Sequence, residues 1–199
     1  EAASKNFSLK SLILGGKKDP TSLQVALVNY QSRLNSDFMA VIDQNRQPVV
    51  STQILEEPMD IGPLNRNLRF GLINGNLYLI SIQAIKEVER IPKPNAYIIA
   101  GLNVSSLFAK DIKSITNFEL SVRYANTVQA STIDNVQPEQ LTSAFMDLVP
   151  LTSNSKIKNS NLVFLNSKPS ISYQSYLGEL NQKPINVFFT LPESKAHLN

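Results

Sequence analysis

The chain has 199 residues, of which 42% are hydrophobic and 18% are charged, and this is the balance of a packed globular protein rather than a disordered one. The formal net charge of +3 arises from 19 basic and 16 acidic residues, which is too weak and too mixed for a surface that follows a phosphate backbone, so no nucleic acid partner is expected. The absence of cysteine excludes disulfides and thiolate chemistry.

The chain begins "EAASKNFSLK" without an initiator methionine. No apolar stretch approaches the roughly 20 residues that a membrane-spanning helix needs. We therefore expect a piece of a longer protein, with any signal or membrane segments outside it.

Two helices are predicted first. Residues 7–14 should form a short helix that ends at Gly15-Gly16. A longer helix should follow, with Asp19 as its cap, Pro20 in its first turn and its end near Asn35. Its apolar residues recur at helical spacing and predict one stripe that packs against a partner: Leu23, Ala26, Leu27, Tyr30 and Leu34.

Strands come next. "FMAVID" and "PVVSTQ" should pair around a turn at residues 44–47, in which Asp43 accepts hydrogen bonds from backbone amides two and three residues further on. The prolines and glycine of residues 54–67 predict a surface loop. The strands expected after it cover residues 68–75, 77–85 and 96–104, with a tight turn at Gly75-Asn76 between the first two.

The second half repeats the helix-then-strands order. A helix capped by Ser105 or Ser106 is expected first, then two short strands, a helical segment started by proline, and three strands of which the last two are joined by a turn at Asn181–Pro184. The helices should cover residues 104–116 and 137–149, the short strands should be "FELSVRYA" and "VQAST", and the last strands should cover 161–166, 170–180 and 185–192.

This order predicts an α+β fold with an antiparallel sheet. We expect one domain in which residues 1–36 form an N-terminal helical region, 37–192 a mixed sheet core and 193–199 a C-terminal tail. The strands beyond residue 160 are too few to build a core alone, so they should complete the first sheet. The alternative is a domain boundary near 134–160, where the apolar content falls.

Catalytic side chains are scarce. The only histidine is His197, in a polar tail near the chain end, so catalysis by a serine and a histidine is excluded. No glycine-rich phosphate loop, nucleophile elbow or zinc-binding helix motif is present. Glu56, Glu57 and Asp60 could attract a hard cation, but their spacing matches no calcium loop. The sequence therefore predicts no catalytic residue, no cofactor and no metal.

Four residues are candidates for a ligand pocket. Arg69 and Arg123 lie within apolar strand segments, where a guanidinium must be paired, solvated at an edge or held ready for an anion. Tyr78 and Tyr97 add aromatic faces and hydroxyls to neighbouring strands. The alternative interpretation is structural, with arginines at a sheet edge and tyrosines in an ordinary core.

Several segments, taken in order over roughly residues 20–192, resemble the extracytoplasmic sensor domains of bacterial transmembrane receptors in the Cache superfamily and the fourth CHASE type. After the amphipathic helix, the segments are "AVIDQNRQPVVST", "GLINGNLYLISIQAI", "AYIIAGLNVSSLFAKDI", "FELSVRYA" with the triplet Ser131-Thr132-Ile133, and "SYLGELNQKPINVFFTLP". Arg46 departs from the glycine usual in the first hairpin, and Asn103 replaces a common basic residue. The amino-acid-binding signature of some double Cache domains cannot be aligned, so the resemblance names no ligand.

The resemblance implies a PAS-like antiparallel sheet with the N-terminal amphipathic helix packed on it. It implies a non-catalytic, periplasmic portion of an inner-membrane receptor that senses a small molecule or a periplasmic protein, as a monomer or a parallel homodimer. Membrane helices would connect it to a cytoplasmic histidine kinase, diguanylate cyclase or phosphodiesterase, nucleotide cyclase or chemoreceptor module, through a shift in conformational populations.

Two alternatives from other classes stay open. One is a periplasmic assembly module that offers a sheet edge to a partner. The other is a small hydrolase that uses the carboxylates of residues 54–67 or Arg69 and Arg123.

Overall fold

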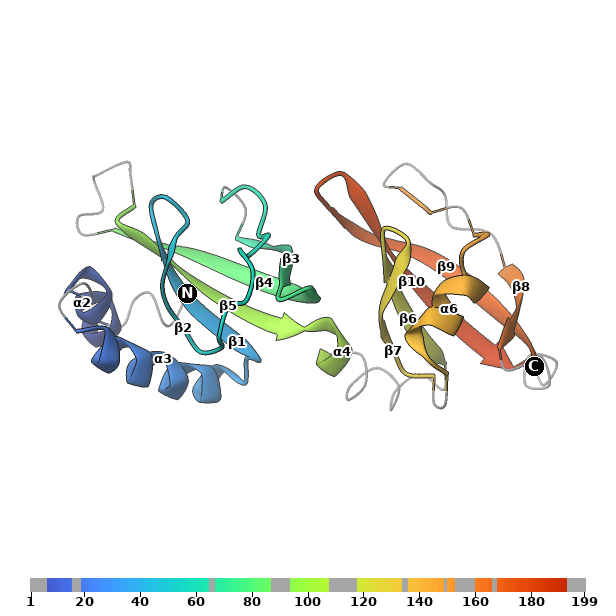
Figure 1. Cartoon of the computed structure of the whole chain (residues 1–199), viewed down its shortest axis with the longest axis horizontal. Helices are drawn as coiled ribbons and strands as arrows, with labels where there is room; N and C mark the ends of the chain where they lie inside the picture. Colours follow the sequence, from blue (N-terminus) through green and yellow to red (C-terminus); the bar gives the residue numbers. More distant parts are fainter. Residues whose placement is uncertain are drawn as a thin grey trace. The chain divides into compact units, whose positions relative to one another are not determined.

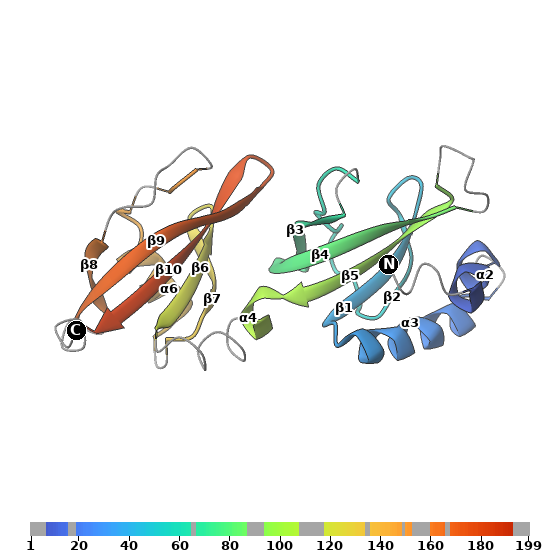
Figure 2. The same ribbon diagram turned by 180° about the vertical axis from the view of Figure 1, so that it is seen from behind.

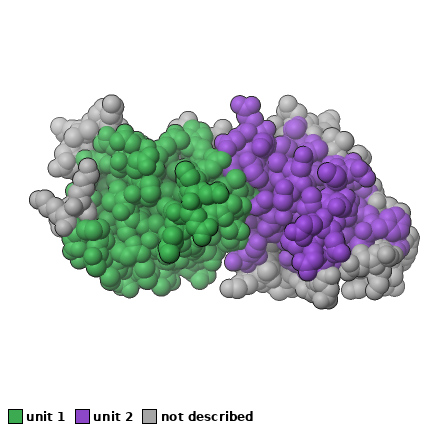
Figure 3. Space-filling view, viewed as in Figure 1, with its two compact units in different colours: residues 1–103 green, residues 104–199 purple. Residues whose placement is uncertain are grey.

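The computed structural model describes nine ranges of the chain, which divides into two compact units, residues 1–103 and 104–199 (Figures 1 and 3). No helix within these ranges is long and apolar enough to cross a membrane. The ranges are 7–15, 19–64, 67–86, 94–107, 118–133, 136–148, 150–152, 160–165 and 168–192.

The first unit is a five-stranded antiparallel sheet in the order β2-β1-β5-β4-β3. Its helices are α2 (Phe7–Gly15) and α3 (Pro20–Leu34), which Figure 2 shows from behind. Its strands are β1 (Phe38–Asp43), β2 (Pro48–Ser51), β3 (Leu68–Ile73), β4 (Asn76–Ile85) and β5 (Ala96–Asn103).

Helix α3 begins and ends where the sequence predicts. The Ser22 backbone N–H donates to Asp19 Oδ1 at 3.0 Å, and Asn35 closes the helix in the left-handed conformation with φ 49°. Leu23 and Leu27 are fully buried in a cluster with residues of β1 and β5. Leu34 is 44% exposed, so its expected place in the apolar stripe is wrong: the stripe ends before the last helical residue.

Two tight turns set the register of the sheet. Asp43 Oδ1 accepts from the backbone N–H groups of Asn45 at 2.8 Å and Gln47 at 2.9 Å, so the second bond reaches four residues on rather than three. Between β3 and β4 the turn is Asn74-Gly75, with φ 47° and 73°, instead of the expected Gly75-Asn76. Asn76 already pairs with Ile73 in the ladder, and this places the turn one residue earlier.

The second unit has its own five-stranded antiparallel sheet, in the order β7-β6-β10-β9-β8. Its described helices are α4 (Val104–Leu107) and α6 (Pro138–Ala144); the rest of the helix expected at 104–116 lies outside the described residues. Its strands are β6 (Glu119–Tyr124), β7 (Thr127–Ser131), β8 (Ser160–Leu165), β9 (Lys168–Leu180) and β10 (Lys183–Pro192).

The expectation that the last strands complete the first sheet is wrong. β10 pairs with β6 along the whole length of β6, from Ile185 opposite Tyr124 to Thr190 opposite Glu119. The short strands β6 and β7 therefore join β8, β9 and β10, and five strands are enough for a separate core. The last turn is also shorter than expected, because Asn181 and Gln182 form it and Pro184 already lies in β10.

The two sheets repeat one design, although no repeat is visible in the sequence. Counted from the first strand of each unit, both have the strand order 2-1-5-4-3. At the end of the second strand, Thr52 Oγ1 accepts the N–H of Met39 at 2.9 Å, and Thr132 Oγ1 accepts the N–H of Leu120 at 2.8 Å. In both places a threonine hydroxyl thus replaces a ladder carbonyl where the second strand leaves its sheet.

Candidate functional site

Three of the four predicted pocket residues lie on one face of the first sheet. Residues paired across antiparallel strands share a face, and so does every second residue along a strand. Arg69 pairs with Ile80, Tyr97 pairs with Ala84, and Tyr78 is on the same side of β4 as both partners. Helix α3 packs on the other face of the sheet. The sheet residues in the apolar cluster with α3 are Met39, Val41, Ile85, Ala96 and Ile98.

The segment of residues 52–64, which we call the cover segment, packs on this face. Ile61 is buried there, and Leu55, Met59 and Leu64 pack beside it on the sheet cluster. The segment has no helix or strand of its own, as expected for a loop, but it lies on the sheet instead of running only through solvent. Its apolar residues explain why, since each is removed from water by this contact.

Beyond Gln53, two further groups of hydrogen bonds hold the cover segment. Asp60 and Leu72 exchange backbone hydrogen bonds of 3.0 and 2.8 Å. The Asn74 side chain accepts from the N–H of Glu56 at 3.0 Å and donates to the carbonyl of Ile54 at 2.8 Å.

Among the described residues, no three His, Cys, Asp or Glu side chains gather closely enough to hold a metal ion.

Arg69 and Tyr78 lie close together under this cover. Tyr78 is buried and its ring lies 6.0 Å from that of Phe38, with room made by Gly101, where an added Cβ would meet the Tyr78 ring at 3.1 Å. Arg69 has buried Nε and Nη1 atoms, and its Nη1 lies 3.8 Å from where a Cβ on Gly62 would be. We call Arg69, Tyr78 and the cover segment above them the covered site.

Tyr97 lies at the other end of this face. Its partner Ala84 is six residues along β4 from Tyr78, which corresponds to about 20 Å at the rise of an extended strand. Tyr97 packs at the edge of the same apolar cluster. A ligand of amino-acid size could not contact both tyrosines, so the two belong to separate parts of the face.

Arg123 belongs to the second unit and has a different environment. It is 3% exposed, its Nη1 and Nη2 donate to the carbonyls of Phe145 at 2.5 Å and Leu148 at 2.9 Å, and its guanidinium lies 5.0 Å from the Phe188 ring. Burial lowers the pKa of Arg123 from its ordinary value. These bonds satisfy carbonyls just beyond the end of α6, which is a structural role.

The second sheet also buries a polar face that the sequence analysis did not single out. Buried polar side chains on this face bond to one another. The Gln174 amide donates to Asn186 Oδ1 in a short contact, and the Thr190 hydroxyl bonds to the Ser172 hydroxyl at 3.2 Å. The signal was present in β9, where Ser170, Ser172 and Gln174 alternate with Ile171 and Tyr173. Alternation alone would assign the polar side to solvent, whereas here the polar side is buried and Tyr173 is exposed.

No protein-family model matches the chain, and no curated protein matches it either. Solved structures of other proteins do match its fold. The periplasmic domain of Vibrio cholerae LuxQ is 15% identical with a TM-score of 0.59, covering 96% of this chain and 88% of LuxQ. The ligand-binding domain of the Pseudomonas aeruginosa amino acid chemoreceptor PctB, in complex with L-Arg, is 12% identical with a TM-score of 0.51, covering 96% and 87%.

A third structure gives the same result. The ligand-binding domain of the Pseudomonas fluorescens chemoreceptor CtaA, in complex with L-isoleucine, is 11% identical with a TM-score of 0.51, and the match covers 94% of this chain and 81% of that domain. At these identities the likeness concerns the fold. The predicted α+β class is confirmed, and the chain has, over nearly its whole length, the fold of the periplasmic and ligand-binding domains of bacterial receptors.

Proposed function

We propose that this chain is the non-catalytic sensing domain of a bacterial membrane receptor, with both units acting as one periplasmic sensor. The observation that carries the proposal is the shared fold, which covers 94–96% of the chain in the three receptor domains above. The match extends through both units, and this supports one sensor over residues 1–199.

The covered site is the proposed ligand site. It combines a guanidinium and a phenol with an apolar loop packed over them, and ligand pockets are often lined by apolar groups with a few polar side chains. PctB is described with L-Arg and CtaA with L-isoleucine, both of which carry a carboxylate. Arg69 is the cationic side chain of the covered site, and a carboxylate matches the fork of an arginine. We therefore expect amino acids or small organic acids as ligands.

Signalling would follow from a change in conformational populations. A ligand that contacts the sheet and the cover segment together favours the conformation in which the two are packed. Such a domain can act as a monomer or a parallel homodimer, and its output would be a kinase, cyclase, phosphodiesterase or chemoreceptor module on the other side of the membrane. A ligand shifts this equilibrium only by its difference in affinity between the two conformations.

A thermal-shift screen tests the proposal. Amino acids, organic acids and polyamines are added to the purified domain, and a ligand of the folded state raises its melting temperature, with about 2.7 kcal/mol of added stability at 100 times Kd. Arg69→Gln and Tyr78→Phe should weaken the response to the active compound. Arg33→Gln, at an exposed position on α3, is the matched control and should leave the response intact.

The outcome also separates the alternative classes. If no carboxylate compound shifts the melting temperature, or if Arg69→Gln responds like the wild type, the covered site is not the ligand site. If a compound is consumed and Arg69→Ala stops its turnover, the chain is an enzyme.

A further inference from the structure

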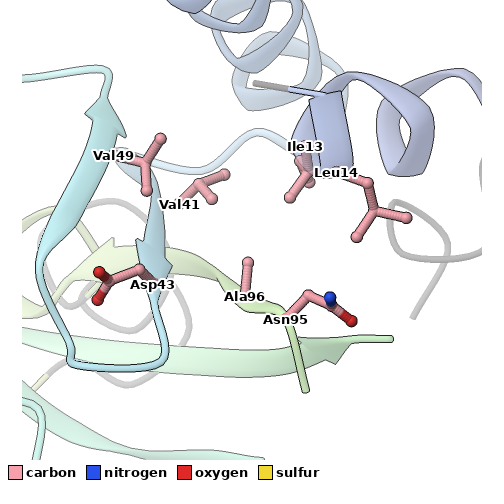
Figure 4. A pocket seen from close by; sticks show the side chains of 7 residues that line it. All are labelled: Ile13, Leu14, Val41, Asp43, Val49, Asn95 and Ala96. Atoms are coloured by element: carbon pink, nitrogen blue, oxygen red, sulfur yellow. The ribbon is translucent and has the colours of Figure 1, made fainter. Parts of the chain in front are cut away.

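A cavity lies on the face of the first sheet opposite the covered site, between α2 and the β1–β2 hairpin (Figure 4). Its volume is about 280 Å³. An engineered apolar cavity of about 150 Å³ holds benzene, so this space suits a molecule with one ring and a short chain. Helix α2, β1, β2 and the start of β5 contribute its lining residues: Ile13, Leu14, Val41, Asp43, Val49, Asn95 and Ala96.

The floor of the cavity is apolar. Figure 4 shows the side chains of Ile13, Val41, Val49 and Ala96 around the space, with Asp43 and Asn95 at its sides. Ile13, Val41 and Ala96 belong to the apolar cluster under α2 and α3. The small Ala96 side chain leaves much of the room, since a longer side chain there would extend into the cavity.

The rim is acidic, and its carboxylate is held in a fixed position. Asp43 is the only ionisable residue among the seven that line the cavity. Its Oδ1 accepts two backbone N–H groups of the β1–β2 turn, at 2.8 and 2.9 Å, and these bonds fix the orientation of the side chain. A fixed carboxylate beside an apolar space attracts a cation with an apolar body and repels an anion.

We propose that this cavity is a second binding site, for a small organic cation such as an aliphatic or aromatic amine. The amine would lie at the Asp43 rim and the apolar body among Ile13, Val41, Val49 and Ala96. A bound molecule would join α2 to the β1–β2 hairpin, so its effect on the domain would be to tighten the N-terminal helix on the sheet. The cavity and the covered site lie on opposite faces of the sheet, so an experiment can refute one proposed site without refuting the other.

The experiment compares three probes with the same ring: phenethylamine, phenethyl alcohol and hydrocinnamate. They carry an amine, a hydroxyl and a carboxylate in turn. Calorimetric titration and thermal shift should rank the amine first and the carboxylate last, and added salt should reduce the difference because the distinction is electrostatic. Failure of the amine to bind the wild-type domain, or equal binding of the carboxylate, would overturn the proposal.

Variants then place the site. Ala96→Leu fills the cavity and should abolish the response to the amine, whereas Ala100→Leu, on the same strand and face but outside the lining, is the matched control. Asp43→Asn keeps an acceptor for the two turn amides and should lower the affinity for the amine at least tenfold, to that of the alcohol. If Ala96→Leu does not fold, Val49→Leu fills the space from β2. An unchanged response in a folded filling variant would show that the amine binds elsewhere.

Discussion

Asp37 Oδ2 accepts a hydrogen bond from the backbone N–H of Asn103 at 2.8 Å, and this bond joins the residue before the first strand of the sheet to the last residue of its fifth strand. Asp37 lies between α3 and β1, and Asn103 is the last residue of β5, directly before the second unit. Asp37 also donates its N–H to the carbonyl of Gly101 at 2.9 Å and accepts from the Gln53 side chain at 2.9 Å. One residue therefore ties together the ends of α3, β5 and the β1–β2 hairpin.

Removing the Asp37 carboxylate should destabilise the domain. Asp37→Ala leaves the Asn103 N–H without this acceptor, and a hydrogen bond to a charged group contributes about 1.5–3 kcal/mol. Asp37→Asn retains an acceptor oxygen and should lose less. Urea unfolding curves with unchanged slopes would measure both losses. Equal losses in the two variants would show that the charge, rather than the acceptor, matters.

Arg123→Met should lower the free energy of unfolding by about 3 kcal/mol or more. The variant leaves the carbonyls of Phe145 and Leu148 without their donors in a buried place, and each such bond to a charged group contributes about 1.5–3 kcal/mol. Arg123→Lys should be intermediate, because one ammonium cannot reproduce the planar fork. Urea unfolding gives the values.

The same variant also tests the ligand role predicted for Arg123 from the sequence. If Arg123→Met is as stable as the wild type but no longer responds to the compound found in the thermal-shift screen, Arg123 is a pocket residue. A destabilised variant that keeps its response supports the structural role.

Local sequence signals predicted the elements of this fold well, because each depends on neighbouring residues. Asp19 and Asn35 bound α3 as expected, and the Asp43 turn joins β1 and β2 as expected. The prediction that the last strands belong to the first sheet was wrong, since sheet pairing depends on contacts between segments that are far apart in sequence. β10 could pair with β6 or extend the first sheet with the same apolar pattern, and only the three-dimensional packing decides between these.

The candidate site likewise has features that the local sequence predicted and others that only long-range packing determines. The sequence indicated Arg69 and Tyr78 by their residue types within apolar strands, but their common face follows from the register of β3 and β4. Residue type also could not separate Arg69 from Arg123, because the carbonyls that Arg123 contacts lie 22 and 25 residues further along the chain. The buried polar side of β9 depends in the same way on what packs against it.

Arg46→Gly should stabilise the first hairpin by about 0.5–1 kcal/mol. Arg46 has φ 65°, in the left-handed region that a glycine adopts without the steric penalty of a Cβ. This is the position where the family resemblance predicted glycine. Gln44→Gly, in the same turn but without a positive φ, is the control and should destabilise instead, because glycine adds freedom to the unfolded chain. A rise in melting temperature for both variants would contradict the explanation.

Acid should weaken the start of α3. Hydrogen bonds from the Ser22 side chain and, second, from its backbone N–H lower the pKa of Asp19 below its ordinary value of 3.8. A carboxyl whose folded pKa is lowered stabilises the folded state above its unfolded pKa, and this contribution is lost as the pH falls through the folded pKa. Asp19→Asn keeps a cap that does not titrate, so its stability should fall less steeply below pH 4 than that of the wild type. Parallel pH profiles for the two proteins would show that Asp19 is not the titrating group.

Asn74→Gly should loosen the cover segment without disturbing the turn. Glycine accepts φ 47° readily, but the bonds to Glu56 N–H and Ile54 carbonyl are lost, at about 1 kcal/mol each. Hydrogen exchange at the Glu56 amide should then accelerate about tenfold, because local opening costs less free energy. Asn181→Gly makes the same change in the β9–β10 turn and should leave Glu56 protected. Unchanged protection in Asn74→Gly would mean that the Asp60–Leu72 bridge and the apolar residues of the segment hold it on the sheet without the Asn74 bonds.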